Sequence, residues 1–197
     1  MTERLAIVTS LHLAGDTEAD QLLARDPFAL LVGMLLDQQV PMEKAFAGPA
    51  VIAARLGTDG LDPEQVAAHD ADEFAALASR TPAVHRFPGS MAARIQKLAT
   101  YVVEEYDGDA SAIWTTAHNG TELLRRLKAL PGFGAQKAAI MVALLGKQFG
   151  VQPDGWREAA GPYGEPDATR SVADVVDAES LARVRATKRE AKRAAKA

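Results

Sequence analysis

The chain has 197 residues, of which 22 are Lys or Arg and 26 are Asp or Glu, so its formal net charge is -4. With 48% hydrophobic and 24% charged residues, it has the composition of an ordinary globular protein of about one domain, which excludes collagen-like and wholly disordered chains. It contains no cysteine, so disulfides, thiolate zinc sites, iron–sulfur clusters and cysteine nucleophiles are excluded.

Helix start signals recur in the first half of the chain. Asp26-Pro27 is typical of an N-cap followed by proline at the first helical position, and the apolar run after it predicts a buried helix. The pair Asp62-Pro63 repeats this signal. Residues 5–13 are the only strand candidate, because apolar residues alternate there weakly.

The second half of the chain is also predicted to be helical. A long helix is expected after Pro88, where apolar residues recur at helical spacing, and another over residues 135–149. Residues 155–175 are rich in Gly and Pro and predict a connecting loop, and residues 178–196 predict a last helix. Many helices with short connections, and no alternation with strands, indicate an all-α domain.

Charge is distributed unevenly along the chain. Residues 1–120 carry 8 basic and 17 acidic side chains, whereas residues 121–197 carry 14 basic and 9 acidic ones. Such an asymmetry can mark an interaction face, so the net charge does not exclude a nucleic acid partner. The last predicted helix is the most basic part, which suits contact with phosphates and equally suits a solvated terminus. Neither a membrane span nor a signal sequence is recognised, so a cytoplasmic, nucleoid-associated protein is expected.

The segment Leu127–Met141 is the most informative stretch. Two glycines lie two residues apart between two predicted helices, and glycine permits a positive φ and a close backbone approach. Amide groups at the start of the second helix would point outward, where the helix dipole favours a phosphate oxygen. The turn resembles the helix–hairpin–helix motif, which binds a DNA backbone without reading its sequence. A glycine-rich corner with no ligand is the alternative. The resemblance gives these candidate DNA-binding residues: Gly132, Phe133, Gly134, Gln136 and Lys137.

The hairpin also resembles that of the HhH-GPD superfamily of base-excision DNA glycosylases. In those enzymes a catalytic Asp follows the Leu-Pro-Gly of the hairpin by some two dozen residues, and Asp154 lies 24 residues after Leu130. Upstream, the run LLDQQVPMEKAF looks like the loop from which the alkylated-base branch inserts a side chain into the space left by an extruded base. Gln39 stands at the matching position, with Gln38 beside it.

The resemblance implies an all-α fold with two helical lobes around a cleft and a six-helix barrel as its core. We expect one domain over residues 1–197. Lobe one would cover about 27–128, and lobe two would combine 1–26 with 129–197.

The implied reaction is hydrolysis of the N-glycosidic bond of a flipped, damaged base. A carboxylate would stabilise the positive charge that develops on the sugar and assist a water, and Asp154 is the candidate; a helix N-cap is its alternative role. Bifunctional members carry a lysine nucleophile two positions after the second glycine, where this chain has Gln136. A monofunctional enzyme is therefore expected. Lys137, turned by one helical position, would face a phosphate or solvent.

Three aromatic residues are candidates for the base pocket: Trp156, Phe28 and Phe87. A cationic alkylated purine would stack well on such rings, and core packing is the alternative for each ring. His85 can donate to a base or phosphate, or be satisfied within the core. We expect double-stranded DNA as partner, a monomer, no metal in the chemistry and no cofactor. The resemblance also suggests a monovalent cation on the hairpin, and the lack of cysteine separates the chain from the cluster-bearing branches.

Two other functions remain compatible with the sequence. A binding protein that kept the hairpin without catalysis would recognise distorted or damaged DNA. A helical protein-interaction domain would use the hairpin only as a packing corner, and the basic balance of the half that contains the hairpin disfavours this reading.

Overall fold

The computed structural model describes residues 11–195, which form eleven α-helices, two short 3₁₀ helices and no strand. The predicted all-α fold is therefore confirmed. Of the strand candidate, residues 5–10 lie outside the described residues, and residues 11–13 form no regular element. None of the described helices combines the length and the apolar character needed to cross a membrane.

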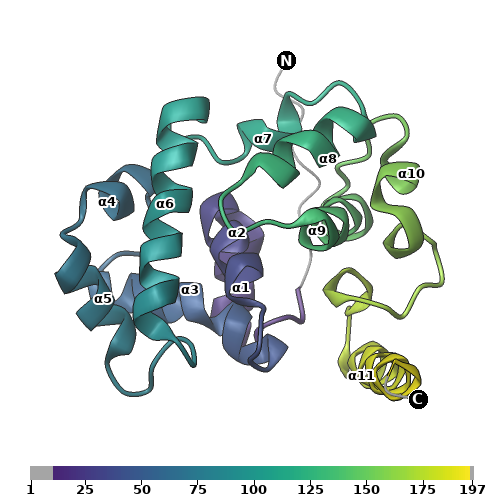
Figure 1. Cartoon of the computed structure of the whole chain (residues 1–197), viewed down its shortest axis with the longest axis horizontal. Coiled ribbons are helices and arrows are strands. Elements are labelled where there is room, and N and C mark those ends of the chain that lie inside the picture. Colours follow the sequence, from purple (N-terminus) through teal and green to yellow (C-terminus); the bar gives the residue numbers. More distant parts are fainter. Residues whose placement is uncertain (1–10, 196–197) are drawn as a thin grey trace.

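Six helices form the first group, which lies around α2 (Figure 1). Helix α1 packs on α2 and α3, while α4 and α5 pack on α6, which also contacts α2. Nine of the ten residues of α2 are buried, as its apolar sequence predicts. The bounds of the group are α1 Thr17–Arg25, α2 Pro27–Leu36, α3 Met42–Leu56, α4 Pro63–Ala68, α5 Ala71–Ser79 and α6 Pro88–Tyr106.

The remaining helices form the second group, at the other end of the molecule (Figure 1). Helices α8 and α9 make the hairpin, and α10 packs on both. The second 3₁₀ helix lies between α9 and α11. The bounds are α7 Ala112–Thr115, α8 Gly120–Ala129, α9 Ala135–Gln148, α10 Trp156–Ala160 and α11 Ala178–Ala194, with 3₁₀ helices at Gly161–Tyr163 and Val172–Asp174.

This grouping differs from the predicted lobe boundaries. Helix α1, assigned to the lobe of residues 129–197, buries Leu22 and Leu23 in the first group, where it contacts α2 and α3. Helix α8, assigned to the lobe of residues 27–128, packs on α9 and α10. The apolar faces of both helices fit partners close to them in sequence.

The helix start signals are confirmed as side-chain caps. The carboxylate of Asp26 accepts a hydrogen bond from the amide of Ala29 (2.9 Å), and that of Asp62 accepts one from the amide of Glu64 (3.0 Å). In both helices proline takes the first position, where its missing N–H is not needed. The cap at Asp26 therefore fixes the start of the central helix, whose other end forms part of the candidate site.

Candidate functional site

A cleft of about 510 Å³ is lined by residues from the end of α2 and from the start of α9. Its volume lies within the roughly 300–1,000 Å³ of small-molecule sites. Both helical groups contribute to it, so it is the place where the hairpin, the loop after α2 and the basic C-terminal helix meet. The lining residues that carry polar side chains are Asp37, Gln38, Gln39, Gln136, Lys137, Tyr163, Arg170, Thr187 and Lys188.

Asp37 supplies the only carboxylate in this lining. It is half-buried at the C-cap of α2, and no described residue donates a hydrogen bond to its carboxylate. Burial raises the pKa of Asp37 above its ordinary value, and the positive charges of Lys188 and Lys137 oppose that rise. The cleft thus contains one carboxylate that is open to a ligand and has a raised pKa.

Lys137 joins the hairpin helix to α2. Its Nζ donates hydrogen bonds to the carbonyl oxygens of Met34 (2.5 Å) and Leu35 (3.0 Å), which lie in the last turn of α2. Burial lowers the pKa of Lys137 to about 8, although the nearby Asp37 favours the charged form. The prediction that Lys137 faces a phosphate or solvent is therefore wrong, because the carbonyl end of a buried helix takes this cation.

The two hairpin glycines differ in whether the fold requires glycine at their position. Gly132 has φ +83°, and a Cβ there would overlap the Cδ1 of Leu35, so the turn needs glycine to pack against α2. Gly134 is exposed, has an ordinary φ of −78° and has open space where a Cβ would lie. No side chain caps α9 after Gly134, so its first amide groups remain available to a ligand.

Phe133, between the two glycines, contributes to folding. Its side chain is only 5% exposed, and its amide donates to the carbonyl of Leu130 (3.0 Å). The expectation that Phe133 contacts DNA is therefore wrong for its side chain. The hairpin presents a ligand with its backbone at Gly134 and Ala135 and with Gln136, all of which are exposed.

The two glutamines after α2 have different environments. Gln38 is held by hydrogen bonds from its Nε2 to the carbonyl of Leu35 (2.9 Å) and from Arg94 to its Oε1 (3.4 Å). Gln39 is exposed and has a left-handed backbone, with φ 57°, which is unusual for a residue other than glycine and often marks functional loops. Of the two predicted positions, Gln39 is the one that projects.

His85 fixes the backbone immediately before Gln39. Its side chain is 2% exposed and lies between two backbone groups. The amide of Phe87 donates to Nδ1 (3.0 Å), so Nε2 carries the proton and donates to the carbonyl of Gln38 (2.7 Å). Of the two roles open to His85 in the sequence, the structure gives it a satisfied place within the fold.

The sequence did not single out several residues of the cleft. Tyr163 accepts a hydrogen bond from Nε2 of Gln136 (2.9 Å) through its hydroxyl, and Arg170 and Lys188 contribute positive charge. Tyr163 ends the 3₁₀ helix after α10 and Arg170 lies in the loop that follows, in a segment that matched no motif. Asp37 adjoins the glutamine pair in the sequence, and this adjacency was the signal that could have identified it.

Asp154 does not line the cleft. Its side chain is exposed, and its carbonyl accepts a hydrogen bond from the amide of Gly120 (2.8 Å), the first residue of α8. The glycine turn follows the other end of α8, about 15 Å away for a helix of ten residues. The N-cap of α10 is Gly155, so Asp154 makes no side-chain cap either. The structure thus does not bring Asp154 together with Gln39.

The three aromatic residues predicted for a base pocket lie elsewhere. Phe28 is fully buried in α2, and Trp156 is buried against Gly146 of α9. Phe87 is 47% exposed but lies outside the cleft lining. The first two pack into the core because large apolar rings are stabilised there by burial. Tyr163 is the one aromatic residue of the cleft.

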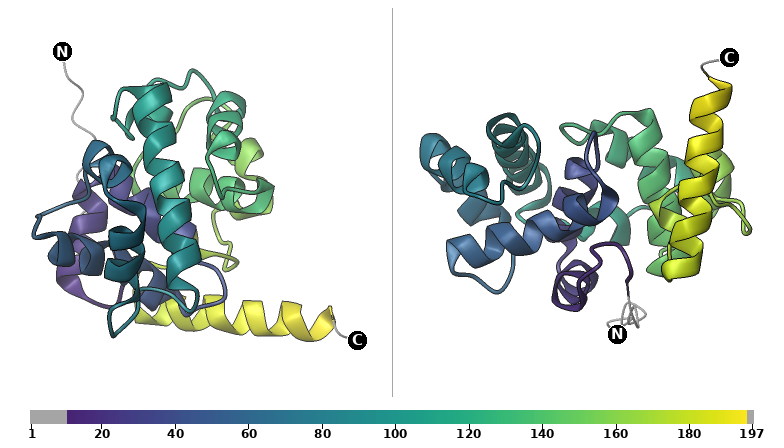
Figure 2. Two further views of the ribbon diagram at one scale, coloured as in Figure 1. Left: turned by 60° about the vertical axis from the view of Figure 1, so that its left-hand side comes forward. Right: turned by 90° about the horizontal axis from the view of Figure 1, so that it is seen from below.

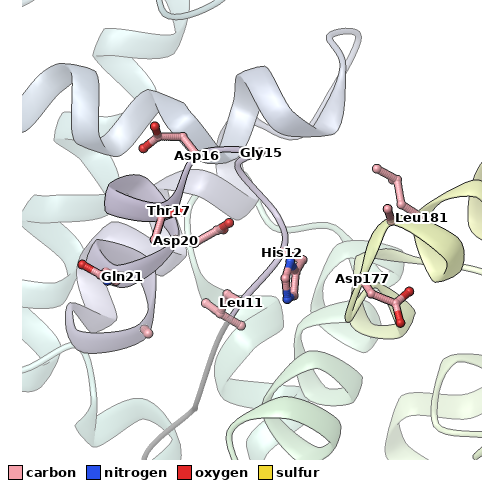
Figure 3. Close-up of a pocket in the computed structure, with 11 residues that line it drawn as sticks. Leu11, His12, Gly15, Asp16, Thr17, Asp20, Gln21, Asp177 and Leu181 are labelled. Atoms are coloured by element: carbon pink, nitrogen blue, oxygen red, sulfur yellow. The ribbon is translucent and has the colours of Figure 1, made fainter.

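A second pocket, of about 440 Å³, lies between α1 and the start of α11 (Figure 3). Asp16, Asp20 and Asp177 line it, but each carboxylate already accepts hydrogen bonds from backbone amides. Within residues 11–195, no group of three or more acidic or histidine side chains has the arrangement of a metal site. This pocket is therefore a junction between elements, and the cleft beside the hairpin remains the candidate site.

Comparison with known proteins gives one family. A model described as HhH-GPD superfamily base excision DNA repair protein matches residues 32–197, which include the end of α2, the hairpin and α11. No curated protein and no solved structure matches the chain.

Proposed function

The chain belongs to the HhH-GPD superfamily of base excision DNA repair proteins, and on that premise we propose that it is a monofunctional DNA glycosylase whose base pocket is the cleft between α2 and α9. Membership implies a DNA substrate and base excision. The observation that carries the finer proposal is the open carboxylate of Asp37, which lines one cleft together with Gln39 and the start of the hairpin helix.

Binding begins at the hairpin. The uncapped amides after Gly134 and the positive end of the α9 dipole suit a phosphate oxygen of the DNA strand. Because the target base cannot be reached within a duplex, it must leave the stack and enter the cleft. Gln39 projects at the mouth of the cleft, where its side chain can fill the space left in the duplex.

Asp37 then supports the chemistry. As the N-glycosidic bond breaks, its electron pair leaves with the base and the sugar becomes positively charged. The ionised carboxylate of Asp37 stabilises this charge and orients a water molecule towards the sugar carbon. The water oxygen bonds to that carbon, and its proton passes to Asp37 and then to solvent or the departing base. The products are the free base and an abasic site.

The hairpin helix places no free amine where a nucleophile is needed, which supports hydrolysis by water. Gln136 stands where bifunctional relatives carry their nucleophile. The Nζ of Lys137 is occupied by carbonyls of α2 and, with a pKa of about 8, is mostly protonated at neutral pH. A protonated amine has no electron pair with which to form a Schiff base. We therefore expect an intact abasic strand as product.

The lining of the cleft favours an uncharged base. Three cations, Lys137, Arg170 and Lys188, face a single acid, Asp37, and there is one aromatic ring. A cationic alkylated purine would meet net positive charge here and would have few rings on which to stack. Deaminated or oxidised bases, which are neutral and carry carbonyl groups, fit these donors better.

A panel of duplexes tests the proposal. Each duplex would carry a single deaminated, oxidised, cationic alkylated or neutral etheno base, and would be scored for abasic sites by alkaline cleavage. We expect release of a neutral base and no covalent protein–DNA adduct after borohydride treatment. Duplex binding without release from any substrate would contradict the enzyme and leave the non-catalytic DNA-binding protein. Borohydride trapping would contradict the monofunctional mechanism.

His85 is expected to act as a positioning residue for Gln39. Replacing His85 with Leu removes the hydrogen bond to the Gln38 carbonyl, which is worth about 1 kcal/mol, so base release at low substrate should fall roughly five- to ten-fold. The readout is base release measured with a lesion opposite each of the four bases, and the control is His118→Leu, at an exposed histidine outside the cleft lining. If His85 had only a stability role, lowering the temperature would restore wild-type rates in the variant.

A further inference from the structure

The C-terminal helix α11 carries a concentration of positive charge. Residues 183–193 contain six Lys or Arg and one acid, Glu190. Within the described chain, Arg183 pairs with Glu179 (2.6 Å) and Arg185 pairs with Glu43 of α3, whereas the other four form no ion pair. These four basic residues, which we call the arm cations, are Lys188, Arg189, Lys192 and Arg193.

The first half of α11 is firmly attached. Asp177 and Ser180 form a capping box at its start, and Ser180 and Val184 are buried. The Thr187 hydroxyl lies 2.9 Å from that of Thr169 in the preceding loop. The Arg185–Glu43 pair adds a contact across to the first helical group. The direction of the helix is therefore set before the arm cations begin.

The second half of α11 has no buried face. Residues 188–195 are exposed, and this end of the helix extends past the rest of the described chain (Figure 2). Its composition of Ala, Lys and Arg favours helix even without packing. The positive charge of this exposed half is therefore available to an anionic ligand.

The position of the helix beside the cleft indicates which anion this is. Thr187, Lys188 and Ala191 line the cleft together with Gln39 and Gln136. The arm cations thus begin at the mouth of the proposed base pocket and continue away from the body of the protein. A duplex bound at the hairpin with one base in the cleft would therefore have this helix beside it, and its phosphates have the complementary charge.

We propose that the second half of α11 is a DNA-backbone contact that binds duplex phosphates flanking the lesion, in addition to the hairpin. The inference rests on the proposed function only for the place where the duplex enters. It predicts that part of the affinity is purely electrostatic and independent of the base in the pocket. Each neutralised phosphate contributes roughly 0.9 to the slope of log K against log salt concentration.

Salt-dependent binding tests the arm. The double variant Lys192→Gln, Arg193→Gln lies outside the cleft lining, and its control, Arg25→Gln with Arg80→Gln, removes the same charge from the first helical group. Fluorescence anisotropy with an undamaged duplex from 50 to 300 mM salt is expected to give a slope about 1–2 lower for the arm variant, with the control unchanged. Release rates at saturating lesion duplex should match the wild type.

Failure of the arm and failure of the enzyme give different results. Equal salt slopes for the arm variant, its control and the wild type would contradict the proposed DNA contact of α11, whether or not the protein releases a base. A lowered slope in the arm variant alone, together with no release from any lesion, would leave the arm intact and overturn the glycosylase. Circular dichroism of both variants checks that a lowered slope does not come from loss of the helix.

Discussion

Asp37→Asn is expected to lower the rate of base release by at least about a hundred-fold while duplex binding persists. General acid–base assistance contributes about 10²–10⁴-fold, and the amide of asparagine supplies neither the proton acceptor nor the negative charge. The substitution keeps the shape of the side chain, and no described residue donates to the carboxylate that it replaces. Single-turnover release and duplex affinity, measured on the same preparation, separate chemistry from binding.

Asp154→Asn is the matched control. Asp154 is exposed at the far end of α8, so we expect wild-type release from this variant. In the wild type, release should also fall on acidification through the pKa of Asp37, which burial raises above the ordinary value of 3.8, because the protonated acid carries no charge. Loss of release in Asp154→Asn with full release in Asp37→Asn would reverse the assignment.

The contrast between these two acids shows where sequence spacing stops being informative. The distance from Leu130 to Asp154 fits the superfamily, but the chain leaves α9 and turns through α10, which packs back on α8 and α9. The amide of Gly120 then holds Asp154 at the start of α8. A residue that follows the hairpin can return to either end of it. Long-range packing decides which end, and a single sequence does not show that packing.

Sequence signals predicted structure correctly where the interacting residues lie within a few positions of each other. The Asp26-Pro27 and Asp62-Pro63 pairs mark helix starts because a cap and its helix lie within four residues. The loop after α2 was singled out from its own residues, and Gln39 lines the cleft, while its insertion into DNA stays a prediction. Lys137 was misread because the sequence does not reveal that the carbonyl end of α2 lies beside the hairpin. Tyr163 was missed because its loop has no regular pattern.

The predicted aromatic residues of the base pocket show the same limit. Aromatic rings that the sequence offered as a pocket, Phe28 and Trp156, are drawn into the core by their apolar area. What remains at the cleft is polar and basic, and this changes the expected substrate from a cationic to a neutral base. The substrate preference that we propose therefore rests on charges that segments from both groups bring together.

Gly134→Leu is expected to lower duplex affinity by at least about ten-fold, with a loss of stability of no more than about 1 kcal/mol from replacing the N-cap glycine of α9. The backbone of Gly134 has an ordinary φ and free space at the Cβ position, so a larger side chain can be accommodated in the fold. The added side chain would occupy the space in front of the uncapped α9 amides, which a phosphate oxygen must approach closely. Anisotropy titration measures the affinity, and urea denaturation measures the free energy of unfolding.

Gly132→Ala, at the same turn, is expected to lower stability. Alanine at φ +83° is strained by about 1–2 kcal/mol, and its Cβ would meet the buried side chain of Leu35, so the free energy of unfolding should fall by at least that amount. Gly132 packs the turn against α2, whereas Gly134 leaves room for the ligand. If Gly134→Leu binds duplex as tightly as the wild type, the hairpin is only a packing corner. If Gly134→Leu loses as much stability as Gly132→Ala, its loss of duplex affinity comes from the damaged fold and does not support phosphate binding at this turn.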